Sequence, residues 1–91
     1  SAGAIVRHVA FGEGQVVALE ANFPECQAKT VELPYLRSLP DEVSFCADGK
    51  TLLHDRFGEG TVFAYIVVFK NHMVSLTYPA TFMNECLVVS S

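Results

Sequence analysis

Six side chains in this sequence are chemically suited to acid–base, nucleophilic or metal chemistry: His8, His54, His72, Cys26, Cys46 and Cys86. A catalytic histidine needs a positioned partner, and no Ser-His-Asp or Cys-His arrangement is recognisable around these residues. None of their spacings resembles a zinc-ligand pair such as Cys-x-x-Cys. We therefore expect a non-catalytic chain without metal or cofactor. An odd number of cysteines without such pairing favours reduced, buried thiols in a cytoplasmic protein.

Two of the histidines belong to a stretch that the chain contains twice. Residues 8–16 and 54–62 both read His-x-x-Phe-Gly-Glu-Gly-x-Val, and residues 3–18 match 49–64 at eight of sixteen positions. His8 and His54 occupy equivalent positions. We therefore predict that they share a structural role, a hydrogen bond of the same kind in each copy, and that neither acts as a general base. Glu13 and Glu59 could form an acid–base pair only if the two turns met, so we expect solvated turn residues.

The glycines of this stretch allow two interpretations, a phosphate cradle or a structural turn. A cradle would need a following Lys-Ser/Thr pair and the start of a helix, and neither is present. We therefore predict that Gly12-Glu13-Gly14 and its second copy form a sharp reversal between strands. The residues of these structural turns are Phe11, Gly12, Gly14, Phe57, Gly58 and Gly60, with the two phenylalanines as core anchors.

The elements around these turns read as short strands. Alternating or continuous apolar runs predict strands at 5–11, 15–20, 29–33, 41–46, 51–54, 61–69, 73–78 and 85–89. A loop is expected at 21–27, a turn at 47–50, and single helical turns at most at 34–40 and 79–84. Sliding the sequence by 43 residues aligns Val31, Leu33, Tyr35 and Glu42 with Val74, Leu76, Tyr78 and Glu85. The prediction is an all-β protein.

Size and composition favour two small units that depend on each other. The 91 residues are 51% hydrophobic and 18% charged, which is ample for a core. Each copy, 1–46 and 47–91, is close to the limit of about 40 residues below which a core rarely suffices alone. The segment from Val62 to Phe69 is apolar on both faces, so we expect the other repeat to cover it, or a second chain in a homodimer. No stretch is long enough to span a membrane.

The second copy also carries a family resemblance. His54-x-x-Phe57-Gly58-Glu59-Gly60-Thr61-Val62, followed by residues 74–82 and Leu87, resembles the Tudor-like, SH3-like small barrels at the carboxy terminus of UvrD/PcrA-type DNA helicases and in related bacterial proteins. The first copy matches well only over residues 6–17. The resemblance implies two packed small barrels and an accessory interaction role, through protein partners or nucleic acid. The helicase module is usually single and more basic than this tandem chain.

Charge and aromatic residues guide the choice of partner. The net charge of −4 disfavours a phosphate-binding surface, so a protein or peptide partner is preferred over direct DNA or RNA binding. Aromatic residues at the loop rims are the binding candidates, and an acidic surface favours a basic peptide. The candidates are Phe23, Tyr35, Tyr65 and Tyr78. Tyr35 and Tyr78 could instead pack at the base of each barrel. A small enzyme with its site between the repeats is the third alternative.

Overall fold

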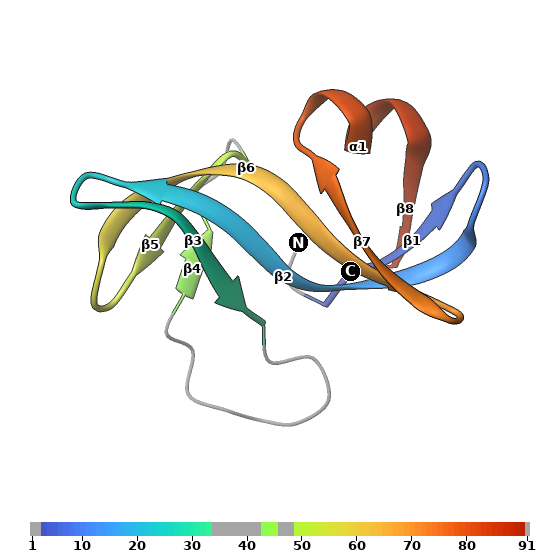
Figure 1. Cartoon of the computed structure of the whole chain (residues 1–91), viewed down its shortest axis with the longest axis horizontal. Helices are drawn as coiled ribbons and strands as arrows, with labels where there is room; N and C mark the ends of the chain where they lie inside the picture. Colours follow the sequence, from blue (N-terminus) through green and yellow to red (C-terminus); the bar gives the residue numbers. More distant parts are fainter. Residues whose placement is uncertain (1–2, 34–42, 46–48, 91) are drawn as a thin grey trace.

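The computed structural model describes residues 3–33, 43–45 and 49–90. The described chain is almost entirely β, so the all-β prediction is confirmed. Its strands form one strongly curled antiparallel sheet with a single short helix (Figure 1). The elements are β1 (Ile5–His8), β2 (Gly12–Phe23), β3 (Cys26–Glu32), β4 (Val43–Phe45), β5 (Thr51–His54), β6 (Gly58–Phe69), β7 (His72–Thr77), α1 (Ala80–Glu85) and β8 (Cys86–Ser90). The helical turn expected at 34–40, and the residues Tyr35, Glu42 and Cys46, lie outside the described residues.

Two long strands, β2 and β6, form the centre of the sheet (Figure 1). They pair antiparallel from Gly14 opposite Phe69 to Asn22 opposite Thr61, with register shifts along the way. Such irregularities bend and twist a strand, so each long strand can pair with neighbours at both ends of the molecule. Two overlapping sets of five strands result, β7-β6-β2-β1-β8 at one end and β3-β2-β6-β5-β4 at the other.

The sequence repeat reappears in the strand positions. The bounds of β5 and β6 follow those of β1 and β2 at a spacing of 46 residues, and their burial patterns are nearly the same. Each five-stranded set takes strands from both halves of the chain, since β1 pairs with β8 and β5 with β4. The two copies are thus joined through shared pairing, while the division at residue 46 stays a prediction.

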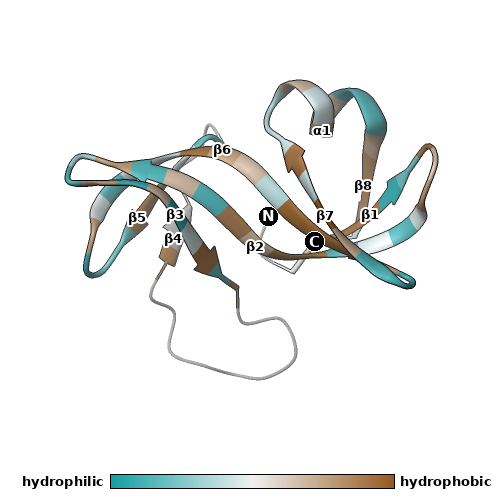
Figure 2. Cartoon of the chain, in the orientation of Figure 1, coloured by the Kyte–Doolittle hydropathy of each residue, from teal (hydrophilic) through white to brown (hydrophobic). Residues whose placement is uncertain are grey.

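The hydrophobic core draws on most strands of this sheet, and the hydropathy of each strand is shown in Figure 2. Its largest fully buried side chains come from β1, β2, β5 and β6: Val6, Val16, Leu19, Leu52, Val67 and Phe69. Most of the segment from Val62 to Phe69 is buried, and it pairs along one edge with β2 of the first copy; that the other repeat covers its faces stays a prediction. A homodimer through this segment stays a prediction, and Val68 is its exposed large apolar residue.

Several details of the strand prediction were wrong: β1 ends at His8 and not at residue 11, and β3 begins at Cys26 and not at residue 29. Strand β2 continues to Phe23, where a loop was expected from residue 21, because Ala21 and Phe23 are buried and paired to neighbouring strands. The 43-residue alignment also fails in β3 and β7. Val31 faces Leu19 and Leu76 faces Tyr65, so Val31 corresponds to Leu76.

The predicted helical turn after Pro79 is confirmed as α1, which leads directly into β8. Its one buried side chain, Phe82, packs against the core. Pro79 stands at the amino-terminal cap, where a missing N–H costs nothing. Within the described residues, no helix is long and apolar enough to cross a membrane.

Candidate functional site

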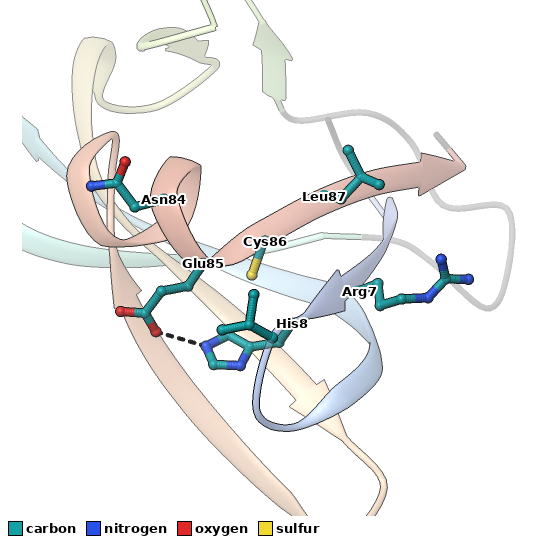
Figure 3. A pocket seen from close by; sticks show the side chains of 7 residues that line it. Arg7, His8, Asn84, Glu85, Cys86 and Leu87 are labelled. Atoms are coloured by element: carbon teal, nitrogen blue, oxygen red, sulfur yellow. Dashed lines mark hydrogen bonds and ion pairs between the residues drawn. The ribbon is translucent and has the colours of Figure 1, made fainter.

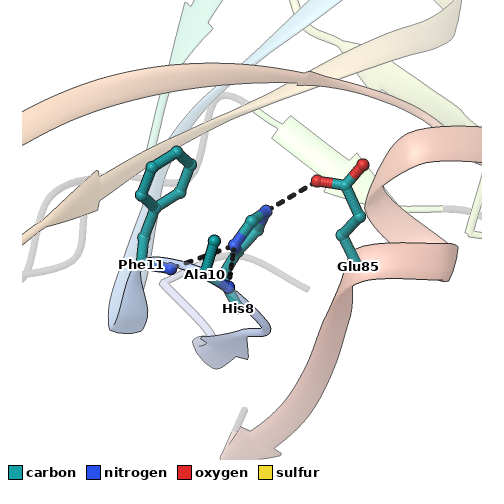
Figure 4. A network of polar contacts seen from close by, with 4 residues as sticks. All are labelled: His8, Ala10, Phe11 and Glu85. Atoms are coloured by element: carbon teal, nitrogen blue, oxygen red, sulfur yellow. Dashed lines mark hydrogen bonds and ion pairs between the residues drawn. The ribbon is translucent and has the colours of Figure 1, made fainter.

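In the first repeated stretch, the His8 side chain stabilises the turn that follows it (Figure 4). The His8 Nδ1 atom accepts hydrogen bonds from the backbone N–H groups of Ala10, at 2.9 Å, and Phe11, at 3.2 Å. A nitrogen that accepts carries no proton, so the proton of neutral His8 lies on Nε2. Nε2 lies 2.8 Å from Oε1 of Glu85 at the end of α1. Both ring nitrogens of buried His8 therefore serve the fold, joining the β1–β2 turn to the helix.

The second copy repeats this arrangement. His54 Nδ1 accepts from the N–H groups of Arg56, at 3.0 Å, and Phe57, at 3.4 Å. The shared structural hydrogen bond expected at the two histidines is thus observed. The turn itself covers residues 9–11 and 55–57, three residues before the predicted 12–14 and 58–60, because Gly12 and Gly58 already begin the outgoing strands. Glu13 and Glu59 are exposed and follow these two turns at opposite ends of the molecule.

The two glycines of each stretch have different tasks. Gly12 and Gly58 have φ values of +78° and +80°, in the left-handed region that favours glycine. Gly14 lies within β2, beneath the Phe69 ring, and Gly60 lies within β6, beneath Phe23. The prediction that Gly14 and Gly60 form the reversal is therefore corrected: they are strand positions that give room to an aromatic ring from the other copy.

An aromatic cluster surrounds each histidine. At the β1–β8 end, the Phe11 ring stacks on His8 at 4.5 Å between centroids and tilts against Phe69 at 5.2 Å. His72 meets the same Phe11 ring edge-on at 4.9 Å. Phe11 nevertheless remains 42% exposed, so it is less buried than the core anchor predicted from the sequence.

The second cluster is built in the same way. Phe57 stacks on His54 at 4.4 Å and tilts against Phe23 at 5.4 Å. Lys29 Nζ lies 4.8 Å from the centre of the Phe57 ring, within cation–π range. The Phe57 cluster therefore contains a cation from its own chain, whereas the Phe11 ring of the other cluster is partly exposed.

The predicted aromatic rim is not assembled by the described residues. Phe23 and Tyr65 are core residues, 4% and 5% exposed, because their rings cover Gly60 and pack against Tyr78 and Phe82 respectively. Tyr78 is half-buried and stacks on Tyr65 at 4.6 Å, in keeping with the packing alternative. Burial, and then the neighbouring Tyr78, raise the pKa of Tyr65 to about 12.

A shallow groove of about 390 Å³ lies beside His8, between β1 and the junction of α1 with β8 (Figure 3). Val9 and Leu87 give it apolar walls, while Arg7 and Glu85 supply one charge of each sign. Burial, and secondarily the Glu85 charge, raise the pKa of the Cys86 thiol, which disfavours its nucleophilic thiolate form. The lining residues are Arg7, His8, Val9, Asn84, Glu85, Cys86 and Leu87.

Apolar side chains are concentrated at this end of the molecule. Val9 is 81% exposed and Leu87 is 63% exposed, with Val88 and Val89 also open to solvent. Within the described part of the chain, β8 pairs with β1 alone, so its other edge is unpaired. Sequence reasoning missed these residues because a short run of Leu and Val reads as a buried strand.

No group of three or more potential metal ligands occurs among the residues that the structure describes. Cys26 and Cys86 are both free and half-buried. The chain matches no protein-family model, and comparisons with curated proteins and with solved structures find no significant similarity.

Proposed function

We propose that this chain is a non-catalytic protein-interaction module that binds an extended peptide segment along the unpaired edge of β8. The observation that carries the proposal is the exposed apolar strand Cys86–Ser90 at the end of the sheet. An unpaired strand edge offers a row of backbone donors and acceptors to another extended chain. Binding by strand addition draws its affinity from these main-chain hydrogen bonds, and neighbouring pockets supply specificity.

The chemistry of β8 suits this use. Edge strands are normally protected by charged residues or proline, and the sequence Cys-Leu-Val-Val-Ser contains neither. The strand at the other end of the sheet path, β4, has only three residues, and shortness is itself a protection. β8 is therefore favoured over β4, the other end of the sheet path. Among the described residues β3 and β7 also have one unpaired edge each, but neither borders the groove beside His8.

The groove beside β8 gives such a peptide a place for a side chain. Val9 and Leu87 can contact an apolar group, and Arg7 and Glu85 can each bind an opposite charge. The net charge of −4 attracts basic partners at long range and opposes binding to phosphate backbones.

The resemblance to the small barrel of UvrD/PcrA-type helicases supports an accessory role in a bacterial nucleic-acid-processing protein. In that setting the module would recruit a protein partner rather than perform a reaction. The rival function is direct DNA or RNA binding, which predicts affinity that falls steeply as salt rises.

Selection from a library of extended peptides, followed by mapping of the bound peptide, tests the proposal. Leu87→Lys places a charge on the edge strand, and Leu53→Lys, at an exposed leucine of β5, is the matched control. We expect selected peptides to protect β8 amides from hydrogen exchange and to lose at least tenfold in affinity with Leu87→Lys only. Equal affinity for both variants would contradict the proposal, as would salt-dependent oligonucleotide binding without any peptide binding.

A further inference from the structure

The Phe11 and Phe57 rings each pack against one histidine and one phenylalanine in nearly the same geometry. Their stacking distances on histidine are 4.5 and 4.4 Å, at interplanar angles of 24° and 26°. Their distances to the second phenylalanine ring are 5.2 and 5.4 Å, at 47° and 49°. A group that suits one ring face should therefore suit the other.

The two rings differ in what lies over them. Lys29 of β3 places its ammonium over Phe57. The corresponding position in β7 is Val74, since Ala21 pairs with Lys29 and Val67 pairs with Val74. Valine has neither the length nor the charge to replace the lysine. The Phe11 ring instead has His72 edge-on at 4.9 Å, and Phe11 stays 42% exposed.

We propose that the open Phe11 ring is a binding site for the ammonium group of a lysine in a basic partner peptide. The attraction is that of a cation to the negative face of an aromatic ring, which Lys29 and Phe57 already display within the chain. Glu13 and Lys70 line one groove beside Gly14 and Phe69, so nearby charges of opposite sign largely offset each other. The ring must therefore supply the local selectivity, while the net charge of −4 favours a basic partner overall.

This site goes beyond the proposed function and does not depend on strand addition to β8. It also predicts a relation between the two ends of the molecule. Removing the Lys29 ammonium should free the Phe57 ring and create a second site of the same kind. Placing a lysine at residue 74 should fill the Phe11 site from within the chain.

The test is a titration of the full-length, isotope-labelled chain with a lysine-containing octapeptide, followed through the aromatic ring resonances. The control peptide carries norleucine, which keeps the alkyl chain and removes the charge. The variants are Phe11→Leu, Val74→Lys and Lys29→Ala, and the last changes an exposed side chain that leaves the fold intact.

We expect the lysine peptide, and not the norleucine peptide, to shift the Phe11 ring signals of the wild-type chain. Phe11→Leu should weaken binding about two- to fivefold, and Val74→Lys should abolish the Phe11 shifts. Lys29→Ala should add peptide-dependent shifts at Phe57. Equal response to the two peptides, or an absence of new Phe57 shifts in Lys29→Ala, would overturn the site. Leu87→Lys should leave these ring shifts in place, which separates the site from the β8 edge.

Discussion

Phe69 lies directly over Gly14, so that a Cβ atom at residue 14 would come within 2.5 Å of the Phe69 ring. Phe23 lies over Gly60 in the same way, also at 2.5 Å. Phe69 ends β6 and Gly14 is the third residue of β2, and Phe23 ends β2 while Gly60 is the third residue of β6. Each copy of the repeat therefore has a glycine at the position where a phenylalanine ring of the other copy packs.

Gly60→Ala should destabilise the fold by about 1–3 kcal/mol, because the added methyl group overlaps the Phe23 ring in a packed core. The three nearest atoms at this position all belong to Phe23, so shortening that side chain with Phe23→Leu should relieve most of the overlap. Gly14→Ala meets the Val68 carbonyl oxygen as well, at 2.8 Å, and Phe69→Leu should relieve it less. Urea denaturation of single and double variants measures both couplings, and equal rescue at the two sites would contradict this geometry.

His8→Ala and His54→Ala should each destabilise the chain by about 1–3 kcal/mol, because two turn N–H groups lose their acceptor. The exposed His72, which meets the Phe11 ring edge-on, is the control, and its replacement by alanine should cost less, about 0.5 kcal/mol. Denaturant midpoints at neutral pH measure the difference. If all three alanine variants are equally stable, the histidines do not fasten the turns.

Tyr65 should ionise late, since its pKa is raised to about 12. A pKa that is higher in the folded chain than the ordinary value of about 10 favours the protonated phenol in the folded state. That contribution is fully present below pH 10 and is lost as the pH rises through 12. Absorbance at about 295 nm should show the late step, and Tyr65→Phe should remove it. A late step that persists in Tyr65→Phe would assign it to another group.

Cys86 should react with iodoacetamide more slowly than a free thiol at the same pH, because burial and the Glu85 charge keep it protonated. Glu85→Gln should move the onset of alkylation to lower pH by removing the smaller of these two causes. Mass spectrometry of the Cys86 peptide across the pH range measures the onset. An unchanged or higher onset in Glu85→Gln would exclude a charge effect from residue 85.

The alternating and continuous apolar runs were enough to predict the β class, and the repeated stretch was enough to predict the structural role of His8 and His54. These features depend on local chemistry, namely glycine conformation, β-branched runs and a histidine at a fixed distance from the turn that it fastens. The position of α1 could also be predicted from the sequence, because Pro79 permits a helix to begin.

The pairing of Gly14 with Phe69 and of Gly60 with Phe23 could not be predicted from local pattern. Each pair joins residues that are distant in sequence and meet only because β2 and β6 run antiparallel through the centre. The same long-range packing buried Phe23 and Tyr65, which read as rim residues, and left Phe11, Val9 and Leu87 exposed. The composition of a strand does not reveal whether it ends at the edge of a sheet.

The most direct test of the interaction-module account is chemical-shift mapping of the full chain with a peptide selected for binding to it. The account predicts that the largest shifts occur at the β1–β8 end, in the amides of residues 86–90 and at Val9 and Phe11. Largest shifts at the opposite end, in β3, β4 and β5, would contradict the account, as would shifts at the β1–β8 end produced only by an oligonucleotide.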